Sequence, residues 1–432
     1  MNRIISYIII TLFGCTHLCA QSFSLAECRK MAIAHNESLK TSSNAIRQAE
    51  LERQIAFAGY LPKLDGTLTG FYMKNIDMMG MKLLTHGTYL AGLTITLPIY
   101  AGGQITAGNR LASIGKDVSE EQYRQAKMQI IADVDKAYYT LIAVRSKVKM
   151  LEAYAQQMLG LYHQVKTSVQ ADLSTQDNLL RISAKQNEIN YQLQKARNGE
   201  ELCRLSLINT IGADLESKII PMDTILTIVT PHDLDEDISY RPEVHLLEKQ
   251  VEAKEQMVKI IRANYLPTAG LSLGYTYYNN LKVKGTSIGP DGNYYPFSQS
   301  YHDNIPMVAV SVSIPLFHWG AELKKVKKAK LDVENARLSL EQNKRGMQIE
   351  VRQAILNLTD GYRMVETAQV GQQQADENLR VMRQKYDNQF ATMTDLLDAQ
   401  SQWQQAHSNY IEAQTQYKIY ETEYLRVRGL LH

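Results

Sequence analysis

Two short segments of this 432-residue chain share one design: LTITLPIYAGG at Leu93–Gly103 and VSVSIPLFHWG at Val310–Gly320. In each, apolar residues alternate with small ones before a proline, an aromatic residue and glycine. Alternation with a period of two predicts a β-strand that has one apolar face. Beyond the prolines, residues 99–220 and 316–432 contain no proline at all, which predicts long helices, because proline breaks helix interiors.

The two segments belong to the two halves of a tandem duplication. YLP occurs at Tyr60–Pro62 and at Tyr265–Pro267, and DLSTQDNLLR at Asp172–Arg181 matches QFATMTDLLD at Gln389–Asp398. We therefore predict a signal peptide at 1–20, a first repeat at 21–239 and a second repeat at 240–432. The first repeat is expected to hold an equatorial start, strands at about 64–72 and 88–98, helices at about 104–211 and an equatorial segment at 212–239. The second is expected to hold a helix, strands at about 269–277 and 307–315, and helices at about 320–429.

A seven-residue apolar repeat runs through the first long stretch without proline. Its members follow gaps of three and four residues, as in coiled coils: Ile131, Val134, Tyr138, Leu141, Val148, Leu151, Ala155, Met158, Tyr162, Val165 and Val169. A helix over 104–171 would be roughly 100 Å long at ~1.5 Å per residue. The helices are expected to fold back at tip turns around Asp172 and Thr175, and around Gln389 and Thr392. Thr392 and Asp395 have the spacing of an N-terminal capping box.

Four alternating segments are predicted strands of about nine to ten residues, with an apolar face and a small polar face. That length suits a tilted strand in an outer membrane, although a strand of a soluble sandwich alternates in the same way. Aromatic residues at both ends of the segments favour the membrane, where they would form two interfacial girdles. We assign Tyr100, Phe317 and Trp319 to the girdle nearer the helices. The segments Met73–Gly87 and Asn279–Ile305 are expected to be loops on the far side of the membrane.

Four strands cannot close a barrel. In lipid every backbone N–H and C=O group must be paired, so at least eight strands are needed. The chain is therefore expected to oligomerise around one shared barrel. Two, three or four copies would give eight, twelve or sixteen strands.

The amino terminus has the features of an export signal. Asn2 and Arg3 precede an apolar run at 4–13, and Ala20 is a plausible end of the signal. The alternative is a lipobox that makes Cys15 a lipidated first residue. After cleavage at Ala20, Cys28 and Cys203 remain; two buried thiols and a disulfide are both open, and the first is favoured.

The composition excludes several function classes. The net charge is +2, and without a long basic or acidic block this argues against nucleic acid as a partner. The sequence contains no HExxH, GxSxG or P-loop motif, and the ten histidines are scattered. We predict no catalytic residue, no cofactor and no metal site.

Taken together, these features resemble the TolC-like outer-membrane efflux protein family. The resemblance rests on SLAECRKMAIAHNESLK at Ser24–Lys40, both YLP turns, both strand exits, and TQDNLL and TMTDLLDAQ in the two tip turns. It implies a mostly α-helical fold with a membrane β-barrel of twelve strands shared by a homotrimer, a periplasmic α-barrel and a mixed equatorial domain.

The function implied by the resemblance is that of a passive exit duct in a tripartite system. Its partners would be a periplasmic adaptor (membrane fusion protein), an inner-membrane pump and outer-membrane lipid. Alternatives are the outer-membrane component of a type I protein-secretion system, a structural coiled-coil protein of the envelope and an uptake porin. The last two leave the strands or the long helices unexplained.

The resemblance also implies a gate at the periplasmic tunnel mouth. Asp395 and Asp398, three residues apart on one helix face, match aspartates that ring this mouth in relatives. The alternatives are a capping role for Asp395 and an ordinary solvated position for Asp398. Tyr386 matches a tyrosine that holds the mouth closed in some relatives, although its usual partners are replaced by Asn178 and Ala391, so it can also simply pack between helices.

Glycine is usual in the family at the two helix-tip positions occupied here by Asp172 and Gln389. Aspartate tolerates a left-handed backbone better than glutamine does. We therefore expect strain or a different turn at the second tip.

Overall fold

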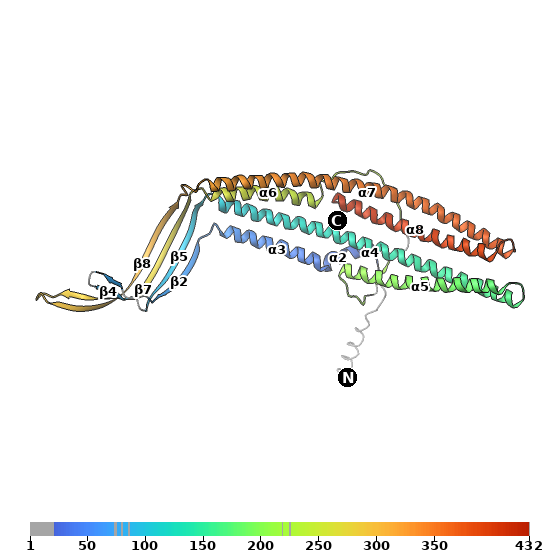
Figure 1. Ribbon diagram of the computed structural model, residues 1–432, viewed down its shortest axis with the longest axis horizontal. Coiled ribbons are helices and arrows are strands. Elements are labelled where there is room, and N and C mark those ends of the chain that lie inside the picture. The colour runs from blue at the N-terminus through green and yellow to red at the C-terminus, as the bar shows by residue number, and fades with distance from the viewer. Residues whose placement is uncertain are drawn as a thin grey trace, which may run out of the picture. The chain divides into compact units, whose positions relative to one another are not determined.

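The computed structural model describes residues 21–72, 76–78, 81–84, 87–217, 219–223 and 226–431 (Figure 1). The expected signal peptide and Cys15 lie outside these residues. The chain forms two compact units. The strand unit comprises Ala45–Glu120 and Leu246–Leu340, and the tip unit comprises Glu121–His245, Glu341–His432 and the described residues up to Asn44.

The strand unit contains an antiparallel sheet whose long strands are β2 (Lys63–Phe71), β5 (Thr88–Ala101), β7 (Thr268–Ile288) and β8 (Tyr294–Ser313). They lie in the order β2-β5-β7-β8, so the two halves of the duplication meet at the β5–β7 pair, where Leu93 faces Tyr275. Among the described residues, β2 pairs only with β5, and β8 only with β7. The sheet is therefore open, with one unpaired edge on β2 and one on β8.

One sequence prediction was wrong: the segment Asn279–Ile305, expected to be a loop, forms the far halves of β7 and β8. These strands have 21 and 20 residues and are joined by a tight turn, in which the Gly289 N–H donates to the Asn293 carbonyl at 2.8 Å. The loop prediction rested on Pro290, Pro296 and several glycines. Pro290 lies in the turn, and Pro296 lies on β8, an edge strand, where a missing N–H costs no hydrogen bond of the ladder if it faces away from β7.

The other expected loop, 73–87, also contains strands. β3 (Ile76–Met78) pairs with β4 (Met81–Leu84), and β4 pairs with β7 beyond the end of β5. Both β-hairpins therefore continue past the segments whose alternation was recognised in the sequence.

Seven helices are described: α2 (Leu25–His35), α3 (Glu37–Ala58), α4 (Gln104–Gln170), α5 (Gln176–Ile211), α6 (Pro242–Ala263), α7 (Ala321–Asp387) and α8 (Met393–Arg428). None of them, within the described part of the chain, has the length and hydropathy of a membrane-spanning helix. The tip unit also holds a small parallel pair, β1 (Gln21–Phe23) with β6 (Ile219–Pro221).

The apolar repeat on α4 lies where a coiled-coil seam is expected. Every predicted member is buried or half-buried, with Ile131, Val134 and Met158 fully buried. The seam is wider than predicted, because Tyr154 and Leu161 are buried as well. In a straight helix with 3.6 residues per turn, residues seven apart do not lie on one line, so the buried side rotates gradually around the helix. A strict seven-residue pattern therefore misses some buried residues beside the seam.

An apolar cluster in the tip unit joins α2, α4 and α5, and an ion pair lies beside it. Arg29 donates from Nε and Nη2 to the carboxylate of Asp135, at 2.6 and 2.5 Å, and Thr422 of α8 donates to the same carboxylate at 2.9 Å. Asp135 is completely buried, so these three donors replace the water that it loses. Cys28 and Cys203 contribute to the cluster as free thiols, and Cys28 is fully buried.

The strand exits bend sharply at residues with left-handed backbones. In the first exit these are Gly102 and Gly103, with φ of 60° and 84°. In the second they are Trp319 and Gly320, with φ of 52° and 70°. Trp319 stands at the position of Gly102 in the repeat, so the second exit holds a bulky residue in a conformation that favours glycine.

Gly102→Ala should destabilise the strand unit more than Gly103→Ala. A Cβ at Gly102 would lie 2.8 Å from the Ala263 carbonyl oxygen and 2.9 Å from the Leu266 Cβ, whereas a Cβ at Gly103 would meet nothing within 4 Å. Both substitutions carry the strain of a positive φ. We expect the first to lower the free energy of unfolding by at least about 1 kcal/mol more than the second, because it adds a steric clash.

The measurement is the thermal unfolding midpoint of each variant purified in mild detergent. Equal decreases in the unfolding midpoint of the two variants would show that the structure accommodates a Cβ near Ala263 and Leu266 without a steric penalty.

Candidate functional site at the helix tips

Both tips of the helical hairpins have the same backbone turn. At the first tip, Asp172 is left-handed with φ of 59°. Its N–H donates to the Val169 carbonyl at 3.1 Å, and the Leu173 N–H donates to the Ser168 carbonyl at 2.8 Å. These two bonds form a Schellman motif, which satisfies carbonyl groups at the end of α4.

The second tip repeats this turn with a less suitable residue. Gln389 has φ of 64°; its N–H donates to the Tyr386 carbonyl at 3.0 Å, and the Phe390 N–H donates to the Lys385 carbonyl at 2.7 Å. The second tip therefore has the same turn as the first. Of the two expected outcomes, strain at Gln389 remains, because a left-handed backbone costs a non-glycine residue about 1 kcal/mol or more.

The returning helices begin with threonine caps. Thr175 accepts a hydrogen bond from the Asn178 N–H at 3.5 Å. At the second tip the predicted capping box is confirmed: Asp395 Oδ2 accepts from the Thr392 N–H at 2.9 Å and from its hydroxyl at 2.7 Å, while the Asp395 N–H donates to Thr392 Oγ1 at 3.2 Å. These bonds from the Thr392 side chain and backbone lower the pKa of Asp395, so its carboxylate stays charged.

Asp398 lies one turn further along α8, and both aspartates are exposed in the chain. The opposite face of this helix is buried, at Met393, Leu396 and Ala399. Within the described residues the Asp398 side chain makes no hydrogen bond or ion pair. The two carboxylates therefore share a solvent-facing side of α8, and one of them has a capping role.

Tyr386 lies on the buried side of the second tip. It packs against the cluster that contains Met393 and Leu396, and burial raises the pKa of its hydroxyl, with a smaller contribution from Asp387. The Asn178 side chain instead donates to Ser174 Oγ at 3.3 Å. Within the described structure no hydrogen bond joins Tyr386 to Asn178, and Tyr386 packs between helices.

A polar network between α7 and α8 was not found from the sequence. Asp376 Oδ1 accepts from Trp403 Nε1 at 2.6 Å and lies 2.8 Å from His407 Nε2, while Gln372 Nε2 lies 3.1 Å from His407 Nδ1. The rings of Trp403 and His407 stack with centroids 4.2 Å apart. The i, i+4 spacing of Trp403 and His407 places them on one helix face, but nothing local to that sequence indicates Asp376 as their partner.

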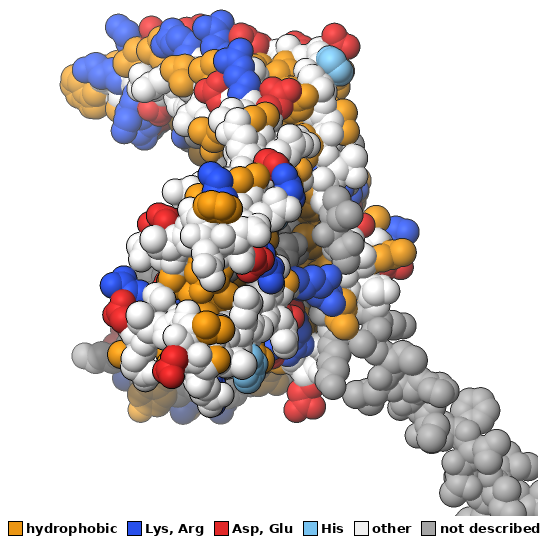
Figure 2. All heavy atoms as spheres, turned by 90° about the vertical axis from the view of Figure 1, so that its right-hand side faces the viewer, with side chains coloured by type: hydrophobic (Ala, Val, Ile, Leu, Met, Phe, Trp, Pro, Cys, Tyr) orange, Lys and Arg blue, Asp and Glu red, His pale blue; other side chains and the backbone are white. Residues whose placement is uncertain are grey.

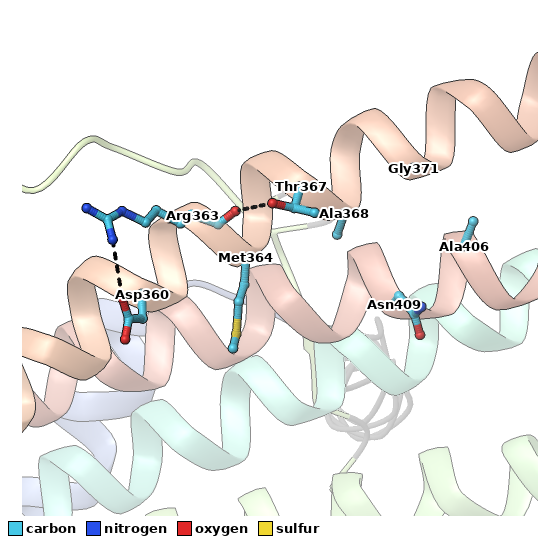
Figure 3. Close-up of a pocket in the computed structure, with 8 residues that line it drawn as sticks. All are labelled: Asp360, Arg363, Met364, Thr367, Ala368, Gly371, Ala406 and Asn409. Atoms are coloured by element: carbon cyan, nitrogen blue, oxygen red, sulfur yellow. Dashed lines mark hydrogen bonds and ion pairs between the residues drawn. The ribbon is translucent and has the colours of Figure 1, made fainter.

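A groove of about 520 Å³ lies on the same helix pair, and Figure 3 shows its lining. Met364, Ala368, Gly371 and Ala406 supply small or apolar surface. Its one carboxylate, Asp360, lies 3.8 Å from the Arg363 guanidinium. Among the described residues no group of three or more His, Cys, Asp or Glu side chains is placed to hold a metal ion.

The tips expose two large apolar side chains at matching positions of the repeat. Leu173 is 81% exposed and Phe390 is 82% exposed, each directly after the left-handed residue of its turn. Figure 2 faces this end of the molecule, where hydrophobic side chains lie open among polar ones.

The candidate girdle residues lie at the strand exits. Trp319 is 88% exposed, Phe317 and Tyr100 are also exposed, and the Phe317 and Trp319 rings lie 5.1 Å apart. On the isolated chain this apolar surface is uncovered, as interfacial aromatic residues of a membrane strand would be.

Comparison with known proteins is consistent with this geometry. The model of the family described as "Outer membrane efflux protein" matches residues 29–206 and 234–426. The chain belongs to this family. Its fold is that of outer-membrane channels, and it is located in the outer membrane with its helical part in the periplasm.

Individual relatives are distant but cover most of the chain. The channel CmeC of Campylobacter jejuni is 18% identical with a TM-score of 0.76, over 94% of this chain and 85% of CmeC. VceC of Vibrio cholerae is 16% identical with a TM-score of 0.76, over 94% of this chain and 96% of VceC. PrtF of Dickeya chrysanthemi, a proteases secretion protein, is 20% identical over 412 residues, 91% of this chain and 85% of PrtF. The family and these relatives are channels or export components rather than enzymes.

Tyr154→Phe should stabilise the tip unit, whereas Tyr138→Phe should destabilise it. Both tyrosines are fully buried on α4. The Tyr154 hydroxyl has no hydrogen-bond partner among the described residues. The Tyr138 hydroxyl donates to Asp223 Oδ2 at 2.8 Å and also lies 3.1 Å from the Phe23 carbonyl oxygen. Removing an unpaired buried hydroxyl avoids a desolvation cost of about 1 kcal/mol, and removing a paired one loses a similar amount.

Thermal unfolding of the two variants in detergent measures the difference. A loss of stability in Tyr154→Phe as large as that in Tyr138→Phe would mean that the Tyr154 hydroxyl is paired in the assembled protein.

Proposed function

We propose that three copies of this chain form a passive exit duct, which receives substrates from an inner-membrane transporter through a periplasmic adaptor. The observation that carries the proposal is the open sheet of an outer-membrane chain. Unpaired N–H and C=O groups on β2 and β8 cannot face lipid, so each edge needs a strand from another copy. Pairing β8 of one copy with β2 of the next is a head-to-tail contact, which closes into a ring.

Three copies give twelve strands, which the family resemblance favours over eight or sixteen. The repeats at 21–239 and 240–432 would each supply two strands and one helical hairpin to the shared barrels. Tyr100, Phe317 and Trp319 would form the girdle nearer the periplasm. β7 and β8, with 21 and 20 residues, exceed the ~9–11 residues that cross a membrane, so their far halves would extend outside the cell.

Asp395 and Asp398 would line the periplasmic mouth of this duct. Threefold symmetry makes six carboxylates from two per chain, and such a ring favours cations over anions. The first repeat carries Asn178 and Arg181 at the matching positions, so this charge belongs to the second tip alone. The capping box uses Asp395 Oδ2 and leaves Oδ1 without a hydrogen bond to any described residue, which makes capping and ion attraction compatible. In this proposal Tyr386 stabilises the mouth by packing, without the hydrogen bond that some relatives use.

The adaptor would dock at the tips. Asp172, Thr175, Gln389 and Thr392 hold the two turns in one shape, which presents Leu173 and Phe390 to a partner. Two identical turns with similar apolar residues would allow one adaptor surface to bind at both tips.

A second function, export of proteins in a type I system, is supported by the similarity to PrtF over 412 residues. A bacterial strain that lacks this chain should have a different defect for each of the two functions. Sensitivity to small toxic compounds would favour efflux, and loss of secreted proteins would favour the type I system.

The mass of the extracted protein tests the shared barrel. We expect light scattering of the mature protein in mild detergent, corrected for bound detergent, to give three times the mass of one chain. A folded single chain would contradict the proposal, because its sheet edges would then be unpaired in the membrane.

Replacing Asp395 and Asp398 with Asn should reduce the preference for cations in planar bilayers. We expect the ratio of cation to anion permeability to fall by roughly twofold or more, because six charges leave the mouth. The matched control is Asp172→Asn with Asp177→Asn, which removes as many charges from the first tip and keeps a residue that tolerates a left-handed backbone. An equal change in the control would assign the effect to overall charge instead of the mouth.

A further inference from the structure

Basic side chains gather on the helical turns next to the strands. The clearest case is the start of α7, where Lys324–Lys330 contains five lysines in seven residues, all of them exposed. The eleven residues of each helix nearest the strands, at 48–58, 104–114, 253–263 and 321–331, contain ten Lys or Arg and four Glu. Their net charge is +6, although that of the whole chain is only +2. The small net charge of the whole chain therefore gives no indication of this local excess of positive charge.

Most of these cations have no partner among the described residues. Lys325 pairs with Glu322 at 2.8 Å, and Arg53 pairs with Glu50 at 2.7 Å. Eight others make no ion pair or hydrogen bond through their side chains to any described residue: Arg110, Lys254, Lys259, Arg262, Lys324, Lys327, Lys328 and Lys330. We call these eight residues the basic collar. Like charges this close repel one another, so an anionic partner outside the chain would stabilise them.

Part of the basic collar lines a groove between α4 and α6. The groove has a volume of about 620 Å³ and is lined by Arg110, Lys259 and Arg262, with Gly102 and Gly103 at its strand end. All three cationic side chains are exposed. Guanidinium groups bind phosphate with paired hydrogen bonds, and the ammonium adds a point charge, so this lining suits a phosphate group.

With the strands in a membrane, the basic collar would lie near the depth of the lipid headgroups. β5 ends at Ala101 and Arg110 is six residues into α4, about 9 Å along its axis at ~1.5 Å per residue. Lys324 is in the first turn of α7, directly after the exposed ring of Trp319. The headgroup layer on one side of a bilayer is roughly 5–8 Å thick, and lysine and arginine side chains reach several ångströms towards it.

We infer that the basic collar binds the phosphate groups of anionic phospholipids in the periplasmic leaflet of the outer membrane. Each of its cations adds to the attraction of an anionic surface. Together with the aromatic girdle, this interaction fixes the depth of the strands in the bilayer. The inference does not depend on which substrate the channel passes or which pump it serves.

Lipid retention by the purified full-length mature protein tests this inference. The protein in neutral detergent is incubated with equal amounts of phosphatidylglycerol and phosphatidylcholine, and native mass spectrometry counts the lipids that remain bound. The test variant replaces Lys324, Lys327, Lys328 and Lys330 with Gln. We expect its retention of phosphatidylglycerol to fall at least tenfold and its retention of phosphatidylcholine to stay unchanged.

Two further variants serve as controls. The first removes the same charge from exposed positions of the tip unit, by Lys→Gln substitution of Lys40, Lys149, Lys166 and Lys195, and should retain lipid as the natural protein does. The second replaces the four collar lysines with Arg and should restore retention, which separates loss of charge from loss of folding.

Three results would overturn the inference. They are unchanged retention in the Gln variant, an equal loss in the tip-unit control, and displacement of the lipid by inorganic phosphate at constant ionic strength. The last would assign the groove to free phosphate. Normal lipid retention combined with lost binding of an adaptor protein would assign the collar to that protein instead.

Discussion

The rest of the structure depends on the pairing of backbone groups in lipid. A strand edge that faces hydrocarbon leaves N–H and C=O groups without partners, and water is absent there to replace them. Within the described residues, the sheet of this chain has two unpaired edges, on β2 and β8, so a single copy would not be a complete membrane structure. The duplication supplies strands in pairs, and each pair is followed by a long helix and its return. Closing the sheet between copies would therefore bring the helical hairpins of those copies around one axis as well.

The two halves of the duplication keep their backbone and differ in chemistry. Both tips are Schellman turns, although one has Asp172 and the other Gln389 at the left-handed position. Both exits bend at the same place, although Gly102 in the first corresponds to Trp319 in the second. The second half thus tolerates strain at both bends. Backbone strain is retained where surrounding contacts or a function offset it, and in this half the strained residues adjoin the carboxylates of the tip and the aromatic girdle.

Features set by local sequence could be predicted, and features set by contact between distant segments could not. The seam on α4 and the capping box of Thr392 and Asp395 follow from spacing within one helix. The far halves of β7 and β8 were missed because Pro290, Pro296 and the glycines near them are typical of a loop. Proline is also tolerated on an edge strand, but the sequence does not tell which strand is the edge. The partnership of Asp376 with Trp403 and His407 depends on how α7 packs against α8, which no local pattern encodes.

Positive and negative charges are unevenly distributed along the chain. The four eleven-residue helix segments beside the strands have a net charge of +6. Because the whole chain has a net charge of +2, the remaining residues have a net charge of −4. An anionic leaflet attracts the first group and repels the second. Asp395 and Asp398 belong to the second group and lie on the helix tip that follows the full length of α7. Both groups would therefore favour one orientation, in which the strand exits meet the headgroups and the carboxylates face the periplasm. Since salt screens charges beyond about 8–10 Å, each group would act mainly on its own surroundings.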